Sequence, residues 1–133
     1  MSERNAAEVE RAIGHVLSTY FAGLYNGDTA LLRSVFDPDA ALFAVQGGAR
    51  YHKPVEIYLA GVATRSSPRE LGEPFAMAVL SLEVLGHMGM AKVHVPARGH
   101  HYVNYLSLLL AEGRWLIVNK LFDDVPPFSI EEN

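Results

Sequence analysis

The first part of the chain carries apolar residues at intervals of three and four positions. From Ala6 to Gly27 they fall on one side of a helical wheel, and the charged residues fall elsewhere. This pattern predicts a long amphipathic helix ending at Asn26-Gly27, because glycine readily adopts the left-handed conformation that closes a helix. Asp28 is placed to cap a short second helix. Asp37-Pro38-Asp39 should close that helix, because proline disfavours helix in the residue before it.

The next segment combines a strand, a turn and a third helix. The pattern predicts a strand over residues 40–45, a turn at Gly47-Gly48 and a short strand at residues 50–52. A third helix should open at Pro54, where proline supplies a suitable backbone angle and no amide donor is needed. Residues 64–74, rich in serine, proline and glycine, are typical of a loop.

Beyond this loop the hydrophobic pattern changes from helical to extended. Four long strands are predicted, with glycine-containing turns between them, at residues 77–85, 90–95, 101–110 and 115–122. Consecutive hairpins give an antiparallel sheet, so the predicted fold class is α+β, with three N-terminal helices on one face of the sheet. We interpret residues 1–133 as a single domain with a core over about residues 6–123 and an extended tail over residues 124–133.

The third long strand is apolar on both of its sides. Alternation places Leu106 and Leu108 on one side and Tyr105 and Leu109 on the other. A sheet with one face in water should instead alternate apolar with polar residues. We therefore predict that the sheet is covered twice, by its own helices and by a second copy of the chain in a homodimer.

Composition narrows the possible partners and chemistry. The chain has 133 residues, of which half are hydrophobic and 20% charged, as expected of one folded domain. Its net charge is −4 and its 11 Lys and Arg residues are scattered, so we expect no nucleic-acid partner. The absence of cysteine excludes disulfides, thiolate nucleophiles and sulfur-ligated metals.

The sequence gives no sign of a membrane segment. Its apolar runs, Leu108–Ala111 among them, fall far short of the roughly 20 residues that a membrane helix needs. The N-terminus lacks the apolar region of a signal peptide. We therefore expect a cytoplasmic protein with no membrane partner.

Two segments resemble a known superfamily. The corner Tyr20-Phe-Ala-Gly-Leu-Tyr-Asn-Gly-Asp28 resembles the opening of nuclear transport factor 2-like (NTF2-like, SnoaL-like) proteins. The segment Asn104-Tyr-Leu-Ser-Leu-Leu-Leu-Ala-Glu-Gly-Arg-Trp-Leu-Ile-Val-Asn-Lys-Leu-Phe122 is similar to the signature of their bacterial branch described as "Putative lumazine-binding". The resemblance spans about residues 8–123 and implies a cone, in which a strongly curved antiparallel sheet wraps a pocket that helices close, usually in a dimer.

Steroid isomerases, polyketide cyclases and dehydratases belong to the same superfamily and permit a residue-by-residue comparison. In the isomerases an oxyanion-hole tyrosine precedes the corner aspartate by eight positions, as Tyr20 precedes Asp28. Their general base, an aspartate, corresponds to Ala44. Their protonated aspartic acid donor corresponds to Asn104, which can donate a hydrogen bond but cannot titrate. Without a base at Ala44, the resemblance argues against that isomerase mechanism.

The resemblance also implies which residues line the pocket. With Asn104 facing inward, Tyr102, Leu106 and Leu108 share its face. The same superposition places four residues of the last strand inside: Leu116, Val118, Lys120 and Phe122. Aromatic residues on such stripes usually pack in the core, but they complete our candidate ligand-binding set. That set is Tyr20, Phe43, Tyr58, Tyr102, Asn104, Lys120 and Phe122.

Lys120 needs an explanation, because an ammonium buried without a partner is costly. Its stem can pack in the cone while its head reaches water or a carboxylate such as Asp123. Alternatively, Lys120 and Asn104 anchor an anionic or carbonyl-bearing ligand in an otherwise apolar pocket. A third explanation is catalysis by an amine of lowered pKa, with Tyr20 as donor.

Six histidines raise the question of a metal site, which their spacing does not favour. His100 and His101 are adjacent on a predicted strand and therefore point to opposite faces. His52 and either His94 or His101 could still converge in space. We expect no metal and no cofactor.

Three functions stay open at this point. We expect a protein that binds a small hydrophobic or amphipathic molecule in an apolar pocket with a few polar anchors. The alternative is an enzyme of the isomerase, cyclase or dehydratase type with an unidentified base. A third possibility, a structural or protein-interaction module, predicts a cone filled by its own side chains. A titratable group within hydrogen-bond reach of Tyr20 or Lys120 at an open cavity would favour an enzyme.

Overall fold

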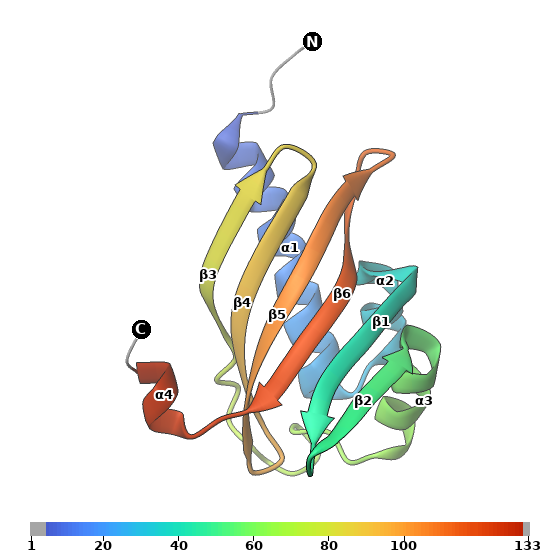
Figure 1. Ribbon diagram of the computed structural model, residues 1–133, viewed down its shortest axis with the longest axis vertical. Helices are drawn as coiled ribbons and strands as arrows, with labels where there is room; N and C mark the ends of the chain where they lie inside the picture. Colours follow the sequence, from blue (N-terminus) through green and yellow to red (C-terminus); the bar gives the residue numbers. More distant parts are fainter. Residues whose placement is uncertain (1–4, 132–133) are drawn as a thin grey trace.

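The computed structural model describes residues 5–131 and consists of helices packed on one curved, unclosed sheet (Figure 1). This arrangement confirms the predicted α+β class. In chain order the elements are α1 (Ala6–Asn26), α2 (Thr29–Val35), β1 (Phe36–Gln46), β2 (Ala49–Pro54), α3 (Val55–Thr64), β3 (Ala78–Leu85), β4 (Met88–Ala97), β5 (His100–Ala111), β6 (Arg114–Asp124) and α4 (Pro127–Glu131).

The helix boundaries follow from local capping chemistry. The Asn5 side chain accepts hydrogen bonds from the first turn of α1 and forms a capping box with Glu8. Gly27 closes α1 in the left-handed conformation at φ 67°, and Asp28 caps α2, as predicted. Within residues 5–131, no helix combines the length and apolar character needed to span a bilayer.

The sheet has the strand order β2-β1-β6-β5-β4-β3 and is antiparallel except at one pair. That exception is the parallel pairing of β1 with β6, which the hairpin pattern did not predict. The long stretch of chain between these strands allows β6 to enter between β1 and β5 in the direction of β1. The central position of β6 brings Leu42 of β1 into register with Lys120.

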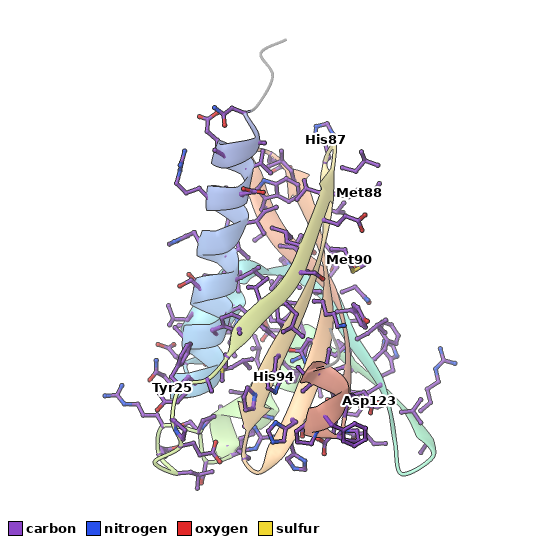
Figure 2. All side chains as sticks on the ribbon, turned by 90° about the vertical axis from the view of Figure 1, so that its left-hand side faces the viewer. Tyr25, His87, Met88, Met90, His94 and Asp123 are labelled. Carbon is purple, nitrogen blue, oxygen red and sulfur yellow. The ribbon has the colours of Figure 1, made fainter. Side chains whose placement is uncertain are left out.

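The sheet has an inner face toward α1 and an outer face that no helix of residues 5–131 fully covers. Ala91, Leu106 and Ile117 point inward and are 0% exposed. Figure 2 shows α1 on one side of the sheet and Met88 and Met90 on the other. The outer face leaves several large apolar side chains exposed: Leu85, Met88, Met90, Tyr105, Leu109 and Leu121.

The predicted inward positions on β6 are only half right. Lys120 and Phe122 lie opposite inward-facing Leu106 and Asn104, but Leu116 does not face inward. Between Ser107 and Leu108 the register shifts, and Val118 is the extra residue of β6. Strict alternation fails across this β-bulge, so Leu116 and Val118 are only half-buried, whereas Trp115 and Ile117 are buried instead.

The predicted extended tail is also wrong. Strand β6 continues to Asp124, and the chain then turns into the short helix α4. Proline at the first position of α4 needs no amide donor, and the Ser129 amide donates to the Pro126 carbonyl at 3.0 Å. Composition alone predicted an extended tail because it did not reveal this turn; residues 132–133 of that prediction lie outside the described residues.

The predicted loop, residues 65–77 in the structure, is fastened to the end of α1. The Arg69 amide donates to the Tyr25 carbonyl at 3.0 Å, and the Tyr25 hydroxyl donates to the Glu73 carbonyl at 2.6 Å. A Cβ at Gly27 would lie 3.1 Å from the Ser67 Cβ, so the loop and the helix end approach closely there. These contacts fix the chain that leaves α3 at Arg65.

Candidate functional site

The inner face of β5 and β6 changes from apolar to polar along its length. Leu108 and Leu106 are 1% and 0% exposed, and the next inward residue of β5, Asn104, is equally buried at 1%. On β6 the residue opposite Leu106 is Lys120, which is 5% exposed. Two polar side chains thus occupy positions that the strand pattern reserves for the core.

Tyr20 of α1 meets Asn104 in the interior. The Tyr20 hydroxyl donates a hydrogen bond to Asn104 Oδ1 at 2.6 Å, and Tyr20 is 0% exposed. Burial, reinforced by the neighbouring Tyr58, raises the pKa of Tyr20, so its hydroxyl keeps its proton and acts as a donor. The Asn104 amide nitrogen has no partner among the described residues.

The ammonium of Lys120 lies among aromatic rings. Nζ is 4.7 Å from the ring centroid of Tyr58 and 5.4 Å from those of Tyr20 and Phe122. Nζ also donates a hydrogen bond to the Tyr58 hydroxyl at 3.2 Å. The Lys120 head therefore lies among aromatic side chains, and within the described residues it forms no ion pair with Asp123.

Positive charge dominates the electrostatics around Tyr58. Burial lowers the pKa of Lys120; Tyr58 partly offsets this shift, and Arg65 and Arg98 add to it. Burial alone would raise the pKa of Tyr58, but the charges of Lys120 and Arg65 and their hydrogen bonds outweigh burial and lower it. Tyr58 is therefore the titratable group within hydrogen-bond reach of Lys120.

These groups adjoin a cavity of about 230 Å³ below the curved sheet. Five of the candidate residues line it: Tyr58, Tyr102, Asn104, Lys120 and Phe122. Tyr20 does not line the cavity and instead lies behind Asn104, which it holds in place. Phe43 does not line it either, because Phe43 stacks on His52 at 4.6 Å and lies in register with outward-facing Leu121.

The cavity has further lining residues that sequence reasoning missed. The polar ones are Gln46, Tyr51, Lys53, Arg65 and Arg98, and the apolar ones are Leu24, Val95 and Ala97. Arg65 follows α3, and Arg98 lies in the β4–β5 turn with a left-handed φ of 51°. No spacing in the sequence connects these two arginines, because only the folded sheet and the fastened loop bring them to one cavity.

The general-base position of the isomerases is occupied by a residue without acid–base chemistry. Ala44 lies on β1 in register with Tyr51, two positions from inward-facing Leu42. An alanine cannot accept a proton, and Ala44 lines a neighbouring hollow, so proton transfer in the cavity would need another group. Among the described lining residues, Tyr58 and Lys120 are the buried titratable pair in hydrogen-bond contact.

The histidines come together only as a pair. His94 Nε2 and His101 Nδ1 are 3.3 Å apart, and burial together with His101 lowers the pKa of His94. His100 Nδ1 instead lies 2.7 Å from Asp124 Oδ2. Within residues 5–131, no three His, Asp or Glu side chains gather in a way that would hold a metal ion.

The arrangement can bind a small molecule and can in principle move a proton. The cavity offers an unpartnered amide nitrogen, a buried ammonium and a phenol of lowered pKa beside aromatic walls. Such a combination of apolar surface and few convergent polar groups is typical of ligand pockets.

Comparison with known proteins agrees with this architecture. The chain resembles crystal structures of NTF2-like proteins of unknown function from three bacteria. It is 22% identical to the Shewanella baltica protein, covering 93% of this chain and 99% of that one with a TM-score of 0.82. It is 22% identical to the Silicibacter pomeroyi protein, covering 92% of this chain and 100% of that one with a TM-score of 0.77. It is 20% identical to the Methylobacillus flagellatus protein, covering 95% of this chain and 99% of that one with a TM-score of 0.77. At these identities the likeness shows the fold alone.

The sequence was also compared with protein families and with curated proteins. No curated protein matches it. The model of the family described as "Putative lumazine-binding" matches residues 8–123. Because that match covers most of the 133 residues, the chain belongs to the putative lumazine-binding family, and its fold is that of nuclear transport factor 2-like proteins.

Proposed function

We propose that this protein binds a small apolar or amphipathic molecule in the cavity, with Asn104, Lys120 and Tyr58 as its polar contacts. The observation that carries the proposal is the cavity of about 230 Å³ at which these three buried side chains converge. Membership of the putative lumazine-binding family supports a small-molecule-binding role.

The energetics of Lys120 also support binding. A buried ammonium weakens the folded state unless something stabilises it, and the Asn104 amide nitrogen opens onto the cavity without a partner among the described residues. A structural module would be more stable with leucine or methionine at these positions. An open cavity beside them likewise favours a binding protein over a cone filled by its own side chains.

The experiment is a ligand screen followed by matched substitutions. Lumazine and a panel of small aromatic acids and amides would be tested by thermal shift, and hits would be measured by calorimetry. We expect Asn104→Leu and Lys120→Met to weaken binding about 10-fold or more, because each removes a buried polar contact.

Matched controls lie on the outer face of the sheet. Asn119→Leu and Lys92→Met make the same chemical changes at positions in register with Ser107 and Tyr105, away from the cavity. These variants should bind the hits with wild-type affinity. Equal affinities in all four variants would show that the hits bind elsewhere and would overturn the proposal.

Catalysis by Tyr58 is the second candidate function. It is favoured by one observation, the 3.2 Å hydrogen bond between the Lys120 ammonium and a phenol whose pKa is lowered. A Tyr58 phenolate could remove a proton from carbon next to a carbonyl and later return one. Incubation with cyclohexanone in deuterated water tests this by NMR. Exchange that Tyr58→Phe abolishes would support catalysis, and no exchange above the buffer rate would contradict it.

We also propose that the protein is a homodimer joined through the outer face. The exposed Leu85, Met88, Met90, Tyr105, Leu109 and Leu121 form the apolar surface that such contact would cover. Analytical ultracentrifugation at micromolar concentration should give twice the 14.6 kDa of one chain. Leu109→Asp should shift the protein toward the monomer. A monomer at every concentration would contradict the proposal.

A further inference from the structure

The charged residues around the cavity are all of one sign. Its lining includes two lysines and two arginines, and none of the described lining residues is Asp or Glu. The four cations are Lys53, Arg65, Arg98 and Lys120. This contrasts with a chain whose net charge is −4, so positive charge is concentrated at this place.

These cations act on one another across the cavity. Burial lowers the pKa of Arg98, and Arg65 is the next largest cause. The same two arginines lower the pKa of Lys120 beyond the effect of burial. The guanidinium of Arg65 lies 5.8 Å from the ring centroid of Tyr58, which places a second cation beside the Lys120 partner. Mutual repulsion of this kind is relieved when an anion enters.

Glu73, Asp123 and Asp124 each contact a group other than these four cationic side chains. Glu73 Oε1 accepts a hydrogen bond from the Arg98 backbone amide at 2.9 Å. Of the groups that shift the pKa of the Arg98 side chain, Glu73 has the smallest effect. Asp123 and Asp124 line a neighbouring hollow rather than this cavity. Asp124 is paired with His100 at 2.7 Å, and Asp123 Oδ1 accepts from the Asp124 amide at 3.0 Å.

The uncharged lining residues and the volume of the cavity indicate the size and apolar character of the ligand. Tyr51, Tyr102 and Phe122 contribute aromatic rings, packed edge to face, and Leu24 and Val95 contribute aliphatic surface. A volume of about 230 Å³ is below the roughly 300–1,000 Å³ of pockets for drug-sized ligands. The cavity therefore suits one small ring with a short polar end.

We propose that the ligand is a small organic carboxylate, with its charged end among Lys120, Arg65 and the Asn104 amide and its apolar body against the aromatic walls. This inference rests on the proposed binding function and names its ligand class. Guanidinium and ammonium groups pair with carboxylates through strong, charge-assisted hydrogen bonds, and the unpartnered Asn104 amide nitrogen supplies a further donor.

The test compares acids with their uncharged amides of nearly the same shape. Calorimetry at low salt would measure benzoate against benzamide and cinnamate against cinnamamide. We expect each acid to bind at least about 10-fold more tightly than its amide. Arg65→Gln and Arg98→Gln should each weaken the acids by about 10-fold and leave amide binding within about twofold.

A control variant separates local from overall charge. Arg11→Gln removes the same charge from the exposed part of α1, outside the cavity lining, and should change neither acid nor amide binding. Amides that bind as tightly as acids would overturn the carboxylate inference and leave the proposed function standing. If none of the four compounds binds but lumazine or another panel member does, the carboxylate inference fails and the proposed function stands. If nothing in either set binds, both fail.

Discussion

The two ends of the inner face are built from the same elements and differ in what they bury. At one end, which we call the apolar end, α1 packs Ile13 against a hydrophobic core that contains Leu108 and Ile117. At the other end α1 presents Tyr20 to Asn104 and, through its ring, to Lys120. The two ends share α1, the strands and the depth of burial. They differ in their side chains and in the cavity that adjoins the polar end.

The difference separates stability from function. Leu108 and Asn104 are both 1% exposed, four positions apart on β5. Burial of a leucine contributes about 1.5–3 kcal/mol of hydrophobic free energy, whereas a buried amide contributes little once its lost hydration is counted. Polar side chains at such positions are therefore hard to explain by folding and easier to explain by a ligand.

The largest expected effect on stability is at the apolar end. Leu108→Ala should lower the free energy of unfolding by about 2–5 kcal/mol, because it removes apolar contacts and leaves a cavity. Urea denaturation followed by circular dichroism measures this change. Leu109→Ala, on the outer face at 45% exposure, is the matched control. At a protein concentration at which ultracentrifugation shows the monomer, it should cost well under half as much. Equal losses in both variants would contradict the assignment of inner and outer faces.

The next effect is at the polar end. Tyr20→Phe keeps the ring but removes the donor that lies 2.6 Å from Asn104 Oδ1, so a buried acceptor loses its partner. We expect the free energy of unfolding to fall by about 1–3 kcal/mol in urea denaturation. In the monomer, Tyr105→Phe on the outer face, 44% exposed, should change it by less than about 0.5 kcal/mol. A neutral Tyr20→Phe would mean that Asn104 is not held from α1.

Much of the fold could be predicted because it follows from local rules. Periodicity located α1, and the capping residues Gly27 and Asp28 gave its end and the start of α2. Glycine-containing turns marked the hairpins of the C-terminal half. What failed was non-local or irregular: the parallel pairing of β1 with β6, the bulge at Val118 and the helical tail.

Asn104 and Lys120 were predicted from the resemblance, and Tyr58 from the apolar stripe of the third helix. Asn104, Lys120 and Tyr58 were named in advance, and the structure brings them to one cavity. Arg65 and Arg98 were not, because one follows a helix and the other occupies a turn, with no spacing to connect them. The cytoplasmic location and the homodimer stay predictions.

The substitution with the smallest expected effect should raise the free energy of unfolding rather than lower it. Lys120→Met replaces a buried ammonium with an apolar side chain of similar length, so we expect the free energy of unfolding at neutral pH to rise by about 1 kcal/mol. Because burial lowers the pKa of Lys120, the unfolded chain binds this proton more tightly than the native state does. The free-energy cost of burying the ammonium is therefore full below the lowered pKa of native Lys120. It fades as pH rises toward the lysine pKa of the unfolded chain, about 10.4.

Urea denaturation of both proteins from neutral to alkaline pH tests this sign. The advantage of Lys120→Met over wild type should shrink as pH rises, since wild type then loses the proton that burial disfavours. Lys92→Met, at a half-buried residue of the outer face, is the matched control for the loss of one lysine. A Lys120→Met protein less stable than wild type would mean that the aromatic rings and Tyr58 fully stabilise the ammonium. The polar end would then be stable without a ligand, as the apolar end is, and Lys120 would give no reason to expect one.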